Sequence, residues 1–160
     1  MNYKQIYLKR GKEESLLRFH PWIFSGAIHH ADDGVSEGEV VRVVTADGRF
    51  AATGHYQGGS IAVRVLSFDD IEINAAFWRQ RLQTALEVRR SLGFLSSPSY
   101  TSAFRLVHGE GDQLPGLIVD VYGTTAVMQA HSIGMHNSRT LIAEMLTEVL
   151  GGHLSSVYYK

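Results

Sequence analysis

The stretch FRLVHGEGDQLPGLIVDVY (residues 104–122) decides the fold of the second half of the chain. Apolar residues recur on both sides of a central segment rich in glycine and proline, which is typical of two strands joined by a tight loop. We therefore predict strands over 104–108 and 117–122. The loop also carries two acids flanked by glycines, Glu110 and Asp112, an unusual composition for a simple connection.

The first seventy residues have the pattern of a β-rich domain. Alternating or continuous apolar residues predict strands over four segments: 4–9, 39–45, 49–56 and 60–66. The dipeptide Asp47-Gly48 between two of these segments is a strong hairpin signal. Several short strands in so short a span favour a small barrel or closed sheet.

Helix signals occur at three places. In RFHPWIFSGAI (residues 18–28), after a charged turn over 10–14, Pro21 and Gly26 predict the start and end of a short helix. Asn74 is a good N-cap for a second helix that Gly93 ends, after which SSPS (96–99) indicates a break. A third helix has one apolar face, formed by Leu141, Ile142, Met145, Leu146, Val149 and Leu150.

The final segment SSVYYK (155–160) is typical of a strand, and it closes the sequence. A strand in that position leaves backbone donors and acceptors open along a sheet edge. We expect this segment either to fray or to pair with a second copy in a homodimer.

Composition indicates a folded protein. Of the 160 residues, 44% are hydrophobic and 19% charged, and the net charge of −1 gives no general attraction to nucleic acid. Arginine supplies most of the basic residues, and its planar guanidinium suits phosphates and stacking. The absence of cysteine excludes disulfides, thiolate zinc sites and a cysteine nucleophile from this chain. With no secretory signal and no apolar run long enough to span a membrane, we expect a cytoplasmic protein.

Basic and aromatic residues are interleaved early in the chain. Phosphate attraction combined with base stacking is typical of single-stranded RNA recognition. The alternative is that Trp22, Ile23 and Phe24 belong to the core. The residues in this pattern are Lys9, Arg10, Lys12, Arg18, His20, Trp22, Phe24 and Ser25.

The sequence predicts no metal site, since none of its eight histidines has the spacing of a zinc motif. GEGDQLPG is not a dinucleotide fingerprint, because its third glycine is misplaced and Pro115 would obstruct a helix start. No segment offers the glycine-rich turn that holds S-adenosylmethionine (SAM). We therefore expect no cofactor site in this chain.

Two sets of motifs resemble one family. HPWIFSGAI (20–28), Gly38-Glu39-Val40 and the pattern from Gly54 to Leu66 are similar to the N-terminal PUA domain of class I SAM-dependent methyltransferases that modify cytosine C5 in large-subunit ribosomal RNA. Residues 104–122 resemble the signature of the small α/β domain in the same family.

The resemblance implies a mixed α/β chain. A PUA-like β pseudobarrel would occupy 1–73, a connecting helix and linker 74–99, and a small α/β domain 100–160, truncated before a Rossmann-type methyltransferase domain. It places Arg18, His20, Trp22, Ser25 and Gly26 nearest the RNA-binding surface.

Glycine and proline shape the backbone of a tight loop, and nothing near the two acids completes a cation or acid–base site. We therefore expect a structural or domain-docking role for the loop residues, to which direct contact with the substrate is the alternative. From charge alone, Arg105 is expected to pair with Glu110 or Asp112. The signature residues are Arg105, Glu110, Asp112, Pro115, Gly116 and Asp120.

The implied function is the RNA-binding portion of a SAM-dependent ribosomal RNA methyltransferase. The catalytic cysteine and the SAM site would belong to a C-terminal domain in cis, so the resemblance implies no catalytic residue in this chain. Two alternatives remain at this point. One is a stand-alone RNA-binding or assembly module, and the other is a protein–protein adaptor with Trp22 and Phe24 as anchors.

Overall fold

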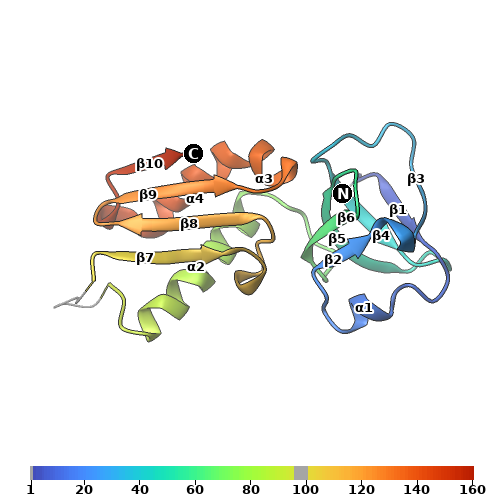
Figure 1. Ribbon diagram of the computed structural model, residues 1–160, viewed down its shortest axis with the longest axis horizontal. Coiled ribbons are helices and arrows are strands. Elements are labelled where there is room, and N and C mark those ends of the chain that lie inside the picture. The colour runs from blue at the N-terminus through green and yellow to red at the C-terminus, as the bar shows by residue number, and fades with distance from the viewer. Residues whose placement is uncertain (1, 96–100) are drawn as a thin grey trace. The chain divides into compact units, whose positions relative to one another are not determined.

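The computed structural model describes residues 2–95 and 101–160, so the predicted break at 96–99 lies outside the described residues (Figure 1). The chain divides into two compact units. The N-terminal unit comprises Met1–Glu72 with Ser132–Gly134, and the C-terminal unit comprises Ile73–His131 with Met135–Lys160. The fold is mixed α/β, as predicted.

The N-terminal unit is built on a curled six-stranded sheet in the order β2-β6-β5-β4-β1-β3. β1 and β4 run parallel, whereas the other neighbouring strands are antiparallel. The strands predicted from alternation are confirmed within one or two residues at their ends. The strands are β1 (Gln5–Leu8), β2 (Trp22–Phe24), β3 (Ile28–Ala31), β4 (Val40–Val44), β5 (Phe50–Tyr56) and β6 (Ile61–Ser67).

Alternation along these strands creates the core of the N-terminal unit, because successive side chains point to opposite faces of a sheet. Val41 and Val43 on β4 are fully buried, and they pack in one cluster with Ile6 and Val63. Position 54 on β5 requires glycine, because the backbone of the neighbouring strand passes too close to leave room for a side chain. An added Cβ would lie 2.3 Å from the carbonyl oxygen of Arg64 on the neighbouring strand. Strands β4 and β5 form a hairpin whose turn contains Asp47-Gly48, as predicted.

The helix predicted in residues 18–28 is wrong. Trp22–Phe24 forms strand β2, which pairs with β6 and is followed by a 3-10 turn at Ser25–Ala27. Pro21 suggested a helix start, but its carbonyl oxygen instead accepts a hydrogen bond from the backbone N–H of Val65 at 2.8 Å. Pairing with β6 thus overrides the local signal. The short helix lies earlier, as α1 (Glu14–Leu17), beginning where a charged turn was expected.

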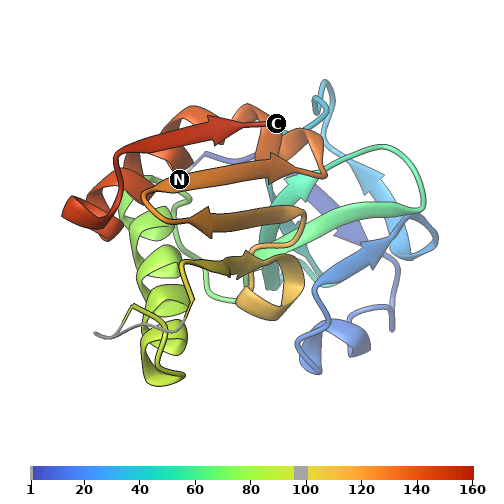
Figure 2. The ribbon, with the colours of Figure 1, turned by 60° about the vertical axis from the view of Figure 1, so that its left-hand side comes forward.

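The C-terminal unit is a four-stranded sheet in the order β10-β9-β8-β7, with α2 and α4 packed together behind the strands (Figure 1; Figure 2). The strands predicted around the central loop are confirmed. The elements are α2 (Ala75–Ser91), β7 (Ala103–His108), β8 (Leu117–Tyr122), β9 (Thr125–Ala130), α3 (Ile133–Asn137), α4 (Arg139–Leu150) and β10 (Ser156–Tyr159).

Helix α2 follows its sequence signals closely. The Asn74 side-chain oxygen accepts hydrogen bonds from the N–H groups of Ala76 and Phe77 at 3.0 and 3.2 Å, which confirms the predicted N-cap. Trp78 and Leu82, on the predicted apolar face, are buried. Beyond the helix end, Gly93 adopts a φ of +88°, a conformation that favours glycine.

Strand β10 lies at the edge of the sheet and runs parallel to β9, with Val157 opposite Ala126. Tyr158 on this strand is 61% exposed. Fraying of the strand or pairing in a homodimer stays a prediction. Within residues 2–95 and 101–160, no helix has the length and apolar character needed to cross a membrane.

Candidate nucleic-acid interface

The predicted basic residues occupy one exposed stretch of the N-terminal unit, in the segment that joins β1 to β2. Lys9 follows β1, Arg10 and Lys12 precede α1, and Arg18 comes directly after it. The ammonium group of Lys9 donates a hydrogen bond to the carbonyl oxygen of Gly26 at 3.0 Å, which ties the two ends of the stretch together. Mobile basic side chains at a surface can contact phosphates without a large desolvation cost.

Three rings form a cluster beside these charges. The ring centroid of Trp22 lies 6.0 Å from that of His20 and 6.4 Å from that of Phe24, in edge-to-face arrangements. The N–H of Trp22 lies 3.2 Å from Nδ1 of His20, so this nitrogen can accept its hydrogen bond. Phe24 is 49% exposed, whereas Ile23 between the two rings is buried. Ile23 is therefore a core residue, as the alternative interpretation expected, and Phe24 is not.

Ser25 and Gly26 complete the predicted set. The N–H of Ser25 donates to the carbonyl oxygen of Ser60 at 2.9 Å, which fixes the turn beside β6. An added Cβ at Gly26 would meet no atom within 4 Å, so the backbone here is open to a ligand. The nine predicted residues thus lie on one segment, in which all but the half-buried Trp22 are exposed. The arrangement can bind phosphates and stack bases, and it contains no evident nucleophile–base pair.

The signature loop of the C-terminal unit is organised by a residue that the sequence analysis did not single out. Arg89 on α2 forms a bidentate ion pair with Asp112, and the side chains are only 13% and 8% exposed. Arg89 Nε also donates to the carbonyl oxygen of Arg105 at 2.9 Å, and Asp112 accepts from the N–H of His108 at 2.6 Å. One buried ion pair therefore fixes α2, β7 and the loop together.

The expected pairing of Arg105 with Glu110 or Asp112 is wrong. Arg105 makes two hydrogen bonds to Asp120, at 2.8 and 3.1 Å, because these residues face each other across β7 and β8. The ion pair raises the pKa of the Arg105 guanidinium. Glu110 lies exposed in the 3-10 turn Gly109–Asp112.

Pro115 is buried, and Gly116 has a φ of +88° that favours glycine. The buried Pro115 and the internal hydrogen bonds of the loop support a structural role for these signature residues. Whether the loop also docks another domain stays a prediction.

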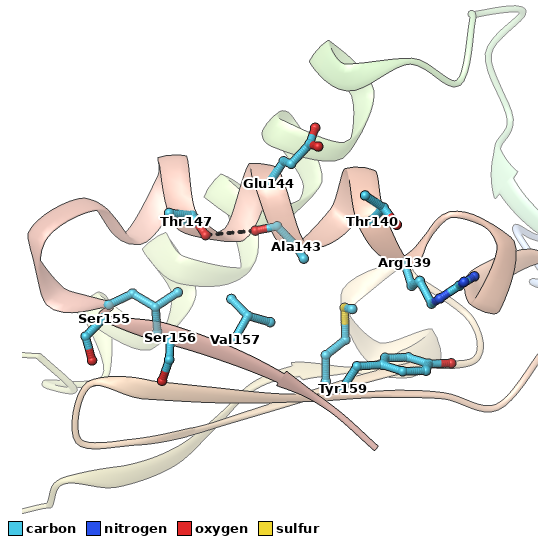
Figure 3. Close-up of a pocket in the computed structure, with 11 residues that line it drawn as sticks. Arg139, Thr140, Ala143, Glu144, Thr147, Ser155, Ser156, Val157 and Tyr159 are labelled. Carbon is cyan, nitrogen blue, oxygen red and sulfur yellow. Dashed lines mark hydrogen bonds between the residues drawn. The ribbon is translucent and has the colours of Figure 1, made fainter.

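A hollow in the C-terminal unit lies between α4 and β10, with a volume of about 500 Å³ (Figure 3). Met128 and Val157 contribute apolar lining, and Arg139 and Glu144 are its charged residues. The Arg139 guanidinium lies 6.0 Å from the ring centroid of Tyr159. The lining has neither a histidine nor a second carboxylate. Among the described residues, no group of three or more acids and histidines could hold a metal ion.

Sequence reasoning missed Arg89, and it also missed Glu13 and Phe19, which line a cavity in the N-terminal unit. Arg89 lies 23 residues before its partner Asp112, and the periodicity of a helix cannot predict a contact between residues so far apart in the sequence. Glu13 and Phe19 flank a helix of one turn, where periodicity carries little information. The sequence around Phe19 has no glycine or asparagine to indicate the left-handed backbone that Phe19 adopts.

Comparison with known proteins defines the class of the N-terminal unit first. Residues 6–68 match the family model of a PUA-like domain, the same residues that form the curled sheet. The chain thus contains a PUA-like domain followed by a small α/β unit.

The particular relatives are ribosomal RNA methyltransferases. The chain is 38% identical over 144 residues to Ribosomal RNA large subunit methyltransferase I of Escherichia coli (strain SMS-3-5 / SECEC), and equally similar to that of Shigella boydii serotype 4 (strain Sb227). The match covers 89% of this chain and 36% of each relative, so the chain spans about a third of their length. The chain is homologous to these enzymes over its PUA-like domain and most of its α/β unit.

Solved structures support the fold over nearly the whole chain. A candidate SAM-dependent methyltransferase from Streptococcus mutans superposes with a TM-score of 0.80 at 17% identity, covering 97% of this chain and 40% of the other. SMU.776, a candidate methyltransferase in complex with SAH, gives 0.79 at 18% identity, covering 98% and 40%. At identities of 17% and 18%, these superpositions show that the fold is shared.

Proposed function

We propose that this chain is the RNA-binding portion of a SAM-dependent methyltransferase that modifies cytosine C5 of large-subunit ribosomal RNA in the cytoplasm. The observation that carries the proposal is the exposed basic and aromatic segment from Lys9 to Gly26 within the PUA-like domain. Homology to Ribosomal RNA large subunit methyltransferase I supports ribosomal RNA as the partner. The domains we propose are 1–73 for RNA binding, 74–99 as connector and 100–160 as the small α/β domain.

The methyl-transfer chemistry is placed outside these residues. Attack on cytosine C6 needs a nucleophile such as a cysteine thiolate, and the chain has no cysteine. SAM would be held by the same part of the longer protein that carries the nucleophile. The 160 residues described here would then select and orient the RNA, which lowers the entropic cost of bringing the target base to the catalytic centre.

The salt dependence of RNA binding tests this proposal. Each phosphate contact contributes roughly −0.7 to the log–log slope of affinity against salt for a single strand. Replacing Arg10, Lys12 and Arg18 together by alanine should therefore flatten the slope by about two units. The measurement is fluorescence anisotropy with a short single-stranded ribosomal RNA fragment over a range of potassium chloride concentrations.

A matched control removes three positive charges from the C-terminal unit, by replacing Arg79, Arg90 and Lys160 with alanine. All three are substantially exposed, and two of them form exposed ion pairs with acids. This variant has the same net charge as the test variant and should keep the wild-type slope. Equal flattening in both variants would mean that RNA binding depends on overall charge and has no site at the Lys9–Gly26 segment.

A stand-alone RNA-binding or assembly module is the second candidate function. The compact, separately organised PUA-like domain favours it, because RNA binding needs only this unit. The encoding sequence beyond Lys160 separates the two proposals. A continuing SAM-binding domain with a cysteine supports the enzyme, and a stop directly after Lys160 supports the module.

A further inference from the structure

The N-terminal unit holds a cavity of about 390 Å³ beside α1, and three phenylalanines help to line it. Phe19 follows α1, Phe50 begins β5, and Phe68 follows β6. The rings of Phe19 and Phe68 meet edge to face, with centroids 5.2 Å apart and planes at 90°. Small-molecule sites occupy roughly 300–1,000 Å³, and aromatic walls suit a flat ring.

Phe19 is held on the surface by an unfavourable backbone conformation. Its φ is +58°, where the Cβ atom of an L-residue is crowded, and its side chain is 71% exposed. Its N–H donates to the carbonyl oxygen of Leu16 at 2.9 Å, and the N–H of His20 donates to that of Ser15 at 3.0 Å. These bonds fix the turn. They are the two hydrogen bonds of a Schellman C-cap on α1, which places Phe19 in the left-handed conformation with its ring at the cavity.

Glu13 is the acidic residue of the cavity, whose other polar lining residues are Thr45 and Arg49. Its side chain lines the cavity, and its Oε2 atom is buried with no hydrogen-bond partner among residues 2–95 and 101–160. A buried acceptor without a donor raises the free energy of the folded protein. The same side chain borders a second hollow that Arg10 and Arg49 help to line. Arg49 pairs with Asp47 at 2.8 Å in this hollow, whereas Arg10 is exposed. A ligand with N–H donors would satisfy the carboxylate, and Arg10 favours an anionic one.

We propose that this cavity binds an unpaired guanine base of an RNA strand, an inference that rests on the proposed RNA-binding function. Guanine presents N1–H and N2–H side by side on its Watson–Crick edge, and the two oxygens of a carboxylate can accept both. Adenine and cytosine place a ring acceptor beside the amino group, and uracil flanks its single N–H with carbonyls. Lys12 and Arg18, on either side of α1, are exposed and available to the adjoining phosphates.

Paired RNA probes test the inference on the whole 160-residue chain. One labelled pentaribonucleotide carries guanosine at the centre of four adenosines, and the other carries inosine, which lacks only the 2-amino group. Fluorescence anisotropy should show roughly tenfold tighter binding of the guanosine probe, the size expected for one hydrogen bond to a charged acceptor. Equal affinities would overturn the inference.

Two isosteric variants locate the effect. Glu13→Gln should lose the preference for guanosine over inosine, whereas Glu14→Gln, at the exposed neighbouring position, should keep it. Glu13→Gln should also melt at the same or a higher temperature without RNA, because it removes a buried, unsatisfied charge. A lower melting temperature would make Glu13 a structural acid and overturn the assignment.

The remaining outcomes separate this inference from the function on which it rests. Binding of both probes with equal affinity, with the salt slope still dependent on Arg10, Lys12 and Arg18, overturns the guanine site alone. No binding of either probe, or of a longer ribosomal RNA fragment, overturns both the site and the proposed function. Equal loss of preference in Glu13→Gln and Glu14→Gln overturns the role of Glu13 in selecting the base.

Discussion

Replacing Asp112 by Asn should lower the free energy of unfolding of the C-terminal unit by about 3 kcal/mol, the lower end of what removing one partner of a buried ion pair costs. The substitution leaves Arg89 charged in a site where its side chain is only 13% exposed. It also weakens the connection among α2, β7 and the signature loop, since Arg89 Nε and the His108 N–H are bonded in the same network.

Urea unfolding followed by Trp78 fluorescence measures this loss, because Trp78 is buried in the C-terminal unit. The measurement is made in a Trp22→Phe background, in which Trp78 is the only tryptophan. Glu148→Gln is the matched control. It removes a carboxylate from the ion pair with Arg79, whose side chains are 44% and 50% exposed, and should change stability far less than Asp112→Asn does. Equal losses in the two variants would contradict a special role for the buried pair.

Lowering the pH from 7.5 to 5 should destabilise the N-terminal unit by about 2 kcal/mol through His55 alone. Burial lowers the pKa of His55 from 6.5 to about 4, and the positive charge of Arg64 adds to this effect. The unfolded chain therefore takes up the proton before the folded protein does. The contribution of His55 to stability is complete above pH 6.5 and is lost as the pH falls toward 4.

His55→Leu removes the titrating group and should flatten this part of the pH dependence. Urea unfolding, followed by amide signals from β5 at pH 7.5 and pH 5, provides the comparison. Hydrogen bonds in the folded protein lower the pKa values of the Asp47, Asp70 and Glu148 carboxyl groups. Their contribution to stability is lost only below their unfolded-state pKa values, which lie at more acidic pH than the range from 7.5 to 5. An identical pH dependence in the wild type and His55→Leu would contradict the assignment.

Sequence patterns correctly predicted the elements that are stabilised by interactions between residues close together in the sequence. The Asn74 cap is formed with N–H groups two and three residues ahead, and the apolar run at 117–122 gives a buried strand. Asp47-Gly48 marks a hairpin because the turn depends on those two residues. In each case the physical cause lies within a few positions of the signal.

Contacts between distant segments account for the errors. Trp22–Phe24 is a strand because β6, about forty residues later, supplies its hydrogen bonds. Arg105 pairs with Asp120 because β7 and β8 place them opposite each other, and Arg89 reaches Asp112 from another element. Of the candidate RNA site, the exposed charges and rings were visible in the sequence. The cavity bordered by Glu13 needed the curled sheet to bring its walls together.

The central claim is that the Lys9–Gly26 segment of the PUA-like domain binds RNA. Titration of the ¹⁵N-labelled chain with a single-stranded ribosomal RNA fragment, followed by amide chemical shifts, tests it most directly. We predict shifts concentrated in residues 9–26, saturating with the RNA and reduced by added salt. Shifts confined to the C-terminal unit, or an unchanged spectrum at saturating RNA, would contradict the claim.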